Sequence, residues 1–188
     1  MLQLVLSSLS QPRETAPTII RWPVGHRELV MAAVLVAVLS GLVDAATRFV
    51  APLPEEFQSM GIASPITMTI VQLISIFVIT MLMYRVGQLF GGVGEFLDAF
   101  KITIWLSLVG LVFTLITVLI MIISPGMAQL FQFVSIIWML VVFTVFIQEL
   151  HGFTTFFTTL AGIIATMFAV ATIIVVGLSM FGLMPQVA

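Results

Sequence analysis

The sequence predicts an all-α fold: an integral membrane bundle of five transmembrane helices with a short interfacial helix at the N-terminus. Of the 188 residues, 61% are hydrophobic and 7% are charged, and the mean hydropathy is +1.29. A water-soluble domain of this size has no means of covering so much apolar surface. Five apolar runs each supply the roughly 20 helical residues that a bilayer core about 30 Å thick requires.

Residues 1–28 form an N-terminal segment that precedes the first apolar run. The apolar side chains of Leu2, Val5, Leu6 and Leu9 recur at helical spacing. This spacing predicts a short helix that lies on the membrane surface and is stopped by Pro12. The segment has no basic stretch ahead of a long apolar run, so we do not expect a cleaved signal peptide.

The transmembrane domain is predicted to cover residues 29–184, followed by a C-terminal tail at 185–188. Its five spans are expected at 29–50, 62–84, 102–123, 127–148 and 153–184. The sequence Ser-Pro-Gly separates the third span from the fourth, because proline and glycine break a helix and favour a turn. The fifth run is longer than a perpendicular crossing needs, so we expect it to tilt or to begin at the interface.

The distribution of basic residues predicts the orientation in the membrane. Five fall on the side of the N-terminus, namely Arg13, Arg21, Arg27, Arg85 and Lys101, and Arg48 falls on the other side. The outer loop at 51–61 carries Glu55 and Glu56 instead. By the positive-inside rule, the N-terminus is cytoplasmic and the C-terminus, after five spans, is periplasmic. The expected location is the bacterial inner membrane.

The loop between the second and third spans contains Gly91, Gly92 and Gly94, followed by Glu95. A phosphate-binding loop of the Walker type requires a lysine and a serine or threonine after its last glycine. The acidic Glu95 occupies that region instead and repels a phosphate. We therefore interpret the three glycines as a hinge that turns the chain between two spans, and expect no bound nucleotide.

Two stretches of the chain resemble a known family. The sequence GGVGEFLDAFKI at the inner end of the second span, and LSQPRETAPTIIRW ahead of the first, are similar to the bacterial branch of the Yip family of five-span membrane proteins. The resemblance implies five spans and a cytoplasmic N-terminus. Eukaryotic members are linked to Rab-type GTPases and vesicle traffic. This chain lacks their long soluble N-terminal region, so the resemblance does not imply a GTPase partner here.

Small residues recur every four positions on two of the spans. On the first span they are Ala33, Ala37, Gly41 and Ala45, and on the fifth they are Ala161, Ala165 and Ala169. Such stripes let helix backbones approach closely, and this close packing drives helix association in lipid. The two stripes either pack within the chain or face a partner protein, and the sequence leaves both open.

Polar side chains inside the spans are candidate functional residues. Asp44 and Arg48 are four residues apart, so they share one helix face and form either an interfacial salt bridge or part of an ion or proton pathway. The amides of Gln72, Gln129 and Gln132 are expected to bond neighbouring helices. Both histidines, His26 and His151, fall at the cytoplasmic surface, where we expect structural roles.

These observations predict a protein without catalytic activity that acts as a packing, scaffold or accessory subunit in the membrane. The chain has no cysteine and no catalytic Ser/His/Asp set, so no metal or cofactor is expected. The expected partners are the lipid bilayer and other integral proteins, with no nucleic acid. A larger energy-transducing complex, respiratory or photosynthetic, is a plausible host. The alternative is a small transporter or channel that uses Asp44, Arg48 and Gln72.

Overall fold

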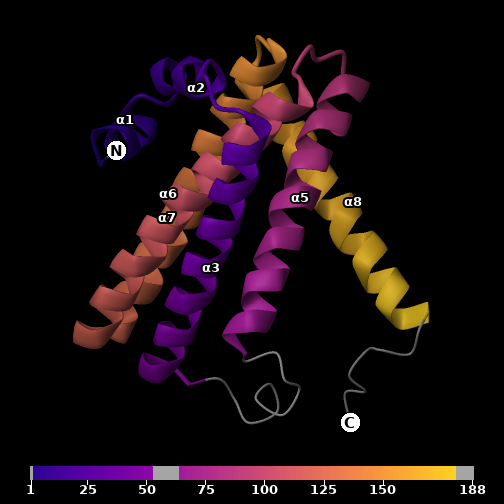
Figure 1. The fold of residues 1–188 in the computed structure, drawn as a ribbon. Coiled ribbons are helices and arrows are strands. Elements are labelled where there is room, and N and C mark those ends of the chain that lie inside the picture. Colours follow the sequence, from indigo (N-terminus) through magenta and orange to yellow (C-terminus); the bar gives the residue numbers. More distant parts are fainter. Residues whose placement is uncertain (1, 53–63, 181–188) are drawn as a thin grey trace.

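Helices make up the computed structural model, which describes residues 2–52 and 64–180 (Figure 1). Five of these helices are long and apolar enough to cross a bilayer. They are α3 (His26–Val50), α5 (Pro65–Leu89), α6 (Phe96–Ile123), α7 (Pro125–His151) and α8 (Phe156–Met180). No strand occurs among the described residues. The predicted all-α, five-span fold is therefore confirmed.

Some predictions fall outside the described residues. They concern the outer loop with Glu55 and Glu56, the first residues of the second span at 62–63, the end of the fifth span at 181–184, and the tail at 185–188.

Four of the five long helices extend beyond the predicted spans at one end of the bundle, whereas α8 begins at Phe156, after the predicted start at 153. There α3 begins at His26, α5 continues to Leu89, α6 begins at Phe96 and α7 continues to His151. Hydropathy marks only the part of a helix that contacts lipid, whereas the helix itself continues through the polar interface. We call this end the glycine-loop end, because the loop 90–95 connects α5 to α6 there.

Serine and proline define the starts of two spans at the opposite end. The side chain of Ser124 accepts a hydrogen bond from the Met127 N–H at 3.4 Å, and Pro125 follows as the first residue of α7. Ser64 caps α5 in the same way, ahead of Pro65. A serine N-cap followed by proline is a favoured helix start. Because Ser124 alone separates α6 from α7, these two helices form a tight antiparallel hairpin.

The N-terminal segment forms two helices, α1 (Leu2–Ser10) and α2 (Pro12–Ile20), where the sequence predicted one. Pro12 does end the first helix, but its fixed φ also suits the first residue of the next. Helix α2 packs against α6 and α7, and Ala16 and Ile19 are completely buried there. The N-terminal segment is therefore part of the packed bundle.

Three hydrogen bonds attach this segment to the spans. The Trp105 indole N–H donates to the Ser8 hydroxyl at 2.9 Å, and the Trp138 N–H donates to the Leu9 carbonyl at 3.2 Å. The Lys101 ammonium donates to the Ile20 carbonyl at 2.8 Å, at the end of α2. Trp138 lies near the middle of α7, so α1 lies alongside the spans and not only across their ends (Figure 1).

Helices α3 and α5 make a close contact at Gly41, within the small-residue stripe of α3. Ala33, Ala37 and Gly41 are buried, and Ala45 is partly buried. A Cβ atom added to Gly41 would lie 2.8 Å from the Pro65 carbonyl oxygen and would overlap the Thr69 hydroxyl. The two backbones therefore touch at Gly41, as close packing of membrane helices through small residues requires.

We predict that Gly41→Ala destabilises the bundle by about 1–3 kcal/mol, because its methyl group collides with backbone atoms that have little room to move. Gly110→Ala in α6 is the matched control, since a Cβ there meets no atom within 4 Å. Thermal unfolding in detergent, followed by circular dichroism, should show a lower Tm for Gly41→Ala alone. Equal effects of the two substitutions would contradict the close contact.

Candidate functional site

The glycine loop ends α5 with a left-handed turn. Phe90 is the C-cap residue of α5. Gly91 follows with a φ of +82°, a conformation that favours glycine. The Gly92 N–H donates to the Gly87 carbonyl at 2.9 Å, which is the hydrogen bond of a Schellman motif. The hinge interpretation thus has a physical basis at Gly91. Gly92 and Gly94 have φ values that other residues also adopt, so they need a different explanation.

That explanation is His151, the last residue of α7, whose side chain lies among these glycines. The residue is 2% exposed. Its Nδ1 accepts a hydrogen bond from the Gly94 N–H at 3.2 Å, and its Nε2 lies 3.0 Å from the Met83 carbonyl oxygen. Because Nδ1 is an acceptor, the proton resides on Nε2, which donates to Met83. The ring is therefore neutral, and both of its nitrogens are hydrogen-bonded.

Three glycines are needed because the imidazole occupies the space of their side chains. A Cβ on Gly92 would lie 2.6 Å from the His151 Cγ, and a Cβ on Gly94 would lie 2.8 Å from its Cε1. A Cβ on Gly87 would overlap the ring. We call Gly87, Gly92, Gly94 and His151 the histidine cradle. It joins the last turn of α5, the glycine loop and the end of α7.

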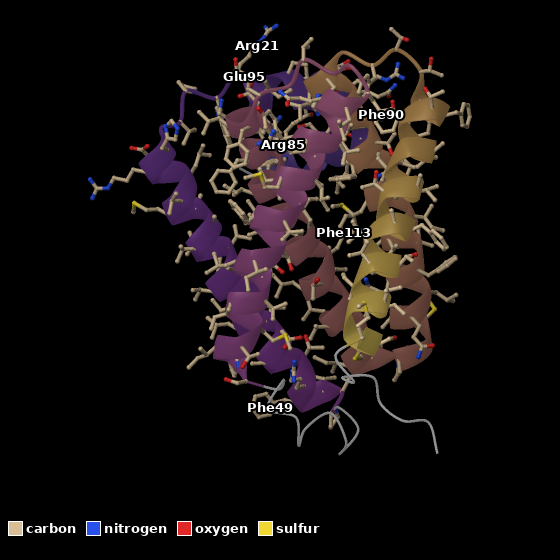
Figure 2. All side chains as sticks on the ribbon, turned by 90° about the vertical axis from the view of Figure 1, so that its right-hand side faces the viewer. Arg21, Phe49, Arg85, Phe90, Glu95 and Phe113 are labelled. Carbon is tan, nitrogen blue, oxygen red and sulfur yellow. The ribbon has the colours of Figure 1, made fainter. Side chains whose placement is uncertain are left out.

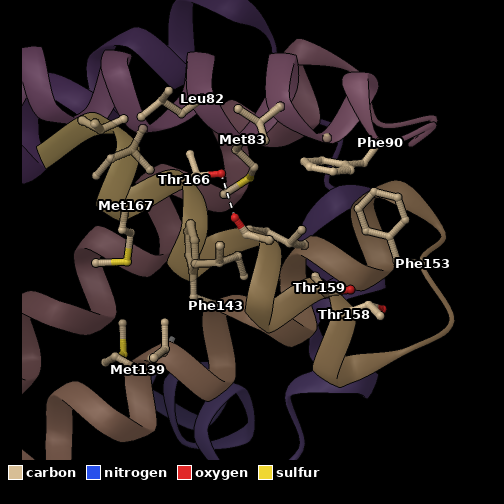
Figure 3. Close-up of a pocket in the computed structure, with 18 of the residues that line it drawn as sticks. Leu82, Met83, Phe90, Met139, Phe143, Phe153, Thr158, Thr159, Thr166 and Met167 are labelled. Carbon is tan, nitrogen blue, oxygen red and sulfur yellow. Dashed lines mark hydrogen bonds between the residues drawn. The ribbon is translucent and has the colours of Figure 1, made fainter. Parts of the chain in front are cut away.

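A lateral groove runs beside the cradle, between α5, α7 and α8 (Figure 3). Its volume is about 840 Å³. Its lining includes Gly87 of the histidine cradle and Met83, whose carbonyl oxygen lies beside the His151 ring. Phe90 and Phe153 lie together at its glycine-loop end, and the Phe153 ring stacks on His151 with centroids 5.4 Å apart. The groove continues along α8 as far as Ile174.

Helix α8 is attached to the bundle along a narrow edge. Among its described side chains, Thr159 and Ile163 are buried, and most of the others are exposed or only partly covered. Figure 1 shows α8 starting beside the other helices at the glycine-loop end and diverging from α5 toward its other end. This divergence of α8 from α5 leaves the space of the groove.

The small-residue stripe predicted on α8 does not face the bundle. Ala161, Ala165 and Ala169 are all exposed. The neighbouring flank of the same helix, with Gly162 and Thr166, lines the groove instead. Periodicity identified a small-residue helix but could not tell which side of it the rest of the chain covers.

The predicted intramembrane polar residues lie away from the groove. Asp44 and Arg48 form a salt bridge of 2.7 Å near the end of α3, at the end opposite the glycine loop. Gln72 is partly buried on α5, and none of these three lines the groove. Gln132 accepts a hydrogen bond from the Thr117 hydroxyl at 3.1 Å, joining α7 to α6 as expected of such an amide.

Sequence reasoning missed the relation between His151 and the glycines, although it placed both at the same surface. His26, the other histidine, is exposed at the start of α3. The available signal was Gly87, a glycine in the last turns of α5, one turn before the loop. A helical glycine of this kind usually marks a close approach of another group.

We predict strong coupling between Gly87 and His151. Gly87→Ala should destabilise the protein by about 1–3 kcal/mol, because its methyl group requires the space of the imidazole. In a His151→Ala background that space is free, so the added cost of Gly87→Ala should nearly disappear. Thermal unfolding of the four proteins of this cycle in one detergent measures the coupling. Additive effects of the two substitutions would contradict the cradle.

The comparisons with known proteins identify the family. No curated protein and no solved structure matches the chain. The family model of the Yip1 domain matches residues 6–183, which include all five long helices and most of the N-terminal segment. The resemblance seen in the sequence is thereby confirmed at the level of the family. The chain is a multi-pass membrane protein that belongs to the Yip family.

Proposed function

We propose that this protein is a non-enzymatic scaffold or accessory subunit that binds other integral proteins of the bacterial inner membrane through α8. The observation that carries the proposal is the exposure of Ala161, Ala165 and Ala169 on a helix attached to the bundle along one edge. Small residues on an exposed helix face let a second helix approach closely, and this contact supplies the dispersion energy that drives association in lipid.

The non-enzymatic part of the proposal is supported by the side chains that catalysis would require, because several of them are held in contacts within the bundle. Both nitrogens of His151 are used in the cradle. Asp44 is paired with Arg48, and Asp98 is paired with Lys101 at 2.9 Å. Among the residues that the structure describes, no three His, Cys, Asp or Glu side chains gather into a metal site. The side chains of His151, Asp44 and Asp98 thus serve structural contacts.

The proposed orientation has the glycine-loop end in the cytoplasm. Arg13 and Arg21 belong to α2 and its end, Arg27 to the start of α3, Arg85 to the last turns of α5, and Lys101 to the first turns of α6. Figure 2 illustrates this distribution, with Arg21 and Arg85 toward one end and Phe49 at the other. Basic residues concentrate on the cytoplasmic side of bacterial membrane proteins, which supports this orientation.

We predict that single cysteines at the two ends of the bundle label from opposite sides of the membrane. The chain has no cysteine, so Glu14→Cys and Ala51→Cys each introduce a unique thiol at an exposed position. In intact cells, a membrane-impermeant maleimide should label Ala51→Cys and should label Glu14→Cys only after the membrane is opened. Labelling of Glu14→Cys in intact cells would overturn the orientation.

We predict that Ala165→Leu weakens the binding of partner proteins while the fold is retained. The leucine side chain holds a facing helix away, and each 1.4 kcal/mol of lost packing lowers affinity about tenfold. Ala46→Leu is the matched control, because Ala46 is an exposed alanine of α3 outside both stripes. The measurement is co-purification from native membranes in mild detergent, followed by native-gel migration and mass spectrometry.

A larger co-migrating complex with wild type and Ala46→Leu, and its loss with Ala165→Leu, is the expected result. The same experiment identifies the host, for which a respiratory or photosynthetic complex is the first candidate. Migration of all three proteins as the isolated chain would refute the scaffold proposal.

A further inference from the structure

The histidine cradle accepts the imidazole of His151 only in its neutral form. The Nδ1 atom accepts a hydrogen bond from the Gly94 N–H at 3.2 Å, and Nε2 donates to the Met83 carbonyl oxygen at 3.0 Å. A second proton on the ring would be carried by Nδ1 and would face the Gly94 N–H, so that two donors oppose each other. Protonation therefore replaces a hydrogen bond with a repulsive contact.

The ring has no room to turn away from this contact while the cradle is closed. His151 is 2% exposed, and its imidazole fills the space in which the Cβ atoms of Gly87, Gly92 and Gly94 would lie. The ring thus packs directly against three stretches of backbone, and a group packed in this way moves only if its neighbours move. To relieve the repulsion, the glycine loop itself has to shift.

No charged side chain is placed to compensate a positive charge on the ring. The titratable and charged groups on the helices that hold or flank the cradle are Tyr84 and Arg85 on α5, Glu95, Asp98 and Lys101 at and after the start of α6, Glu149 on α7, and Arg13, Glu14 and Arg21 on or directly after α2. The structure gives the His151 ring no hydrogen bond and no ion pair with any of these described residues. Glu95 and Glu149 are exposed, and Asp98 is paired with Lys101. A buried cation without a partner is costly.

The same side chain holds two segments that have little other support. The glycine loop is tied to α7 by the Gly94 bond and by the Val93 N–H, which donates to the His151 carbonyl at 3.4 Å. Phe153, in the connection to α8, stacks on the imidazole. An aromatic ring in this position attracts a cation but offers no acceptor for its proton. Because α8 has few buried side chains of its own, displacement of the imidazole frees the start of α8 together with the loop.

We propose that the histidine cradle is a proton-sensitive latch, which opens when His151 takes up a proton and then releases the glycine loop and the start of α8. A histidine in an unfolded chain is mainly neutral above about pH 6.5. The latch is closed in that range, and acidification below it favours the open form, because the open form binds one more proton. The proposal rests on the cradle alone and does not depend on partner binding by α8.

The test follows the mobility of the glycine loop with a single spin label. The chain has no cysteine and Val93 is exposed, so Val93→Cys provides one labelling site on the loop. The full-length protein is reconstituted in phospholipid nanodiscs, and its EPR spectrum is recorded from about pH 8 to about pH 5, a range that spans histidine protonation. The mobile fraction of the label should rise on acidification, and the ratio of open to closed forms should increase by up to about tenfold for each pH unit.

Two histidine variants in the same labelled background separate the cradle from other titrating groups. In His151→Gln the amide can still accept from the Gly94 N–H and donate to the Met83 carbonyl, but it does not titrate, so label mobility should not change with pH. His26→Gln is the matched control, because His26 is exposed at the start of α3 and should leave the transition as in wild type. A wild-type label whose mobility stays constant over this range, or an unchanged transition in His151→Gln, would overturn the latch.

A second measurement does not depend on any variant of His151. In protein labelled with nitrogen-15 histidine, NMR distinguishes the two neutral tautomers and the cation, and comparison with His26→Gln assigns the signals of His151. We expect a proton on Nε2 in the closed form, and proton uptake over the same pH range as the gain in label mobility. Protonation of His151 while the loop stays immobile would show that the closed cradle accommodates the cation, and would also defeat the proposal.

Discussion

The hydrogen bonds of the His151 ring connect elements that lie far apart in the sequence. Gly94 belongs to the loop before α6, Met83 to the last turns of α5, and His151 to the end of α7. The Val93 N–H adds a further bond, to the His151 carbonyl at 3.4 Å. In surroundings of low dielectric such bonds are strong, and leaving either partner unpaired is costly. His151 thus ties the glycine loop to the ends of α5 and α7.

The rest of the architecture follows from where this attachment lies. Helix α8 begins a few residues after His151, and Phe153 in the short connection stacks on the imidazole. The start of α8 is thus held close to α5 and α7, while its remaining turns have few buried side chains. A helix held at one end and free to diverge along its length leaves a wedge of space. The groove is that wedge, and its narrow edge is the contact of Thr159 and Ile163.

The sequence predicted five long apolar helices correctly because a bilayer admits few alternatives. Backbone groups in hydrocarbon must be satisfied within the segment, so an apolar run of sufficient length forms a helix whatever packs beside it. Turn chemistry is equally local, which explains the break at Ser124 and the turn at Gly91. The burial of His151 depends instead on which helix ends converge. Likewise, the exposure of Ala165 and the groove position of Gly162 depend on tertiary packing that periodicity does not encode.

Polar groups within the spans are mostly satisfied by the chain itself. Threonine hydroxyls donate to the carbonyl four residues earlier on their own helices, as at Thr80, Thr103, Thr144 and Thr166. Gln132 bonds a neighbouring helix. Neighbouring molecules in the bilayer can therefore recognise the surface of the described spans mainly by its shape. Recognition by shape requires backbones that neighbours can approach, or concavities that they can fill. Helix α8 provides both on adjacent flanks, in the exposed alanines Ala161, Ala165 and Ala169 and in the groove beside Gly162 and Thr166.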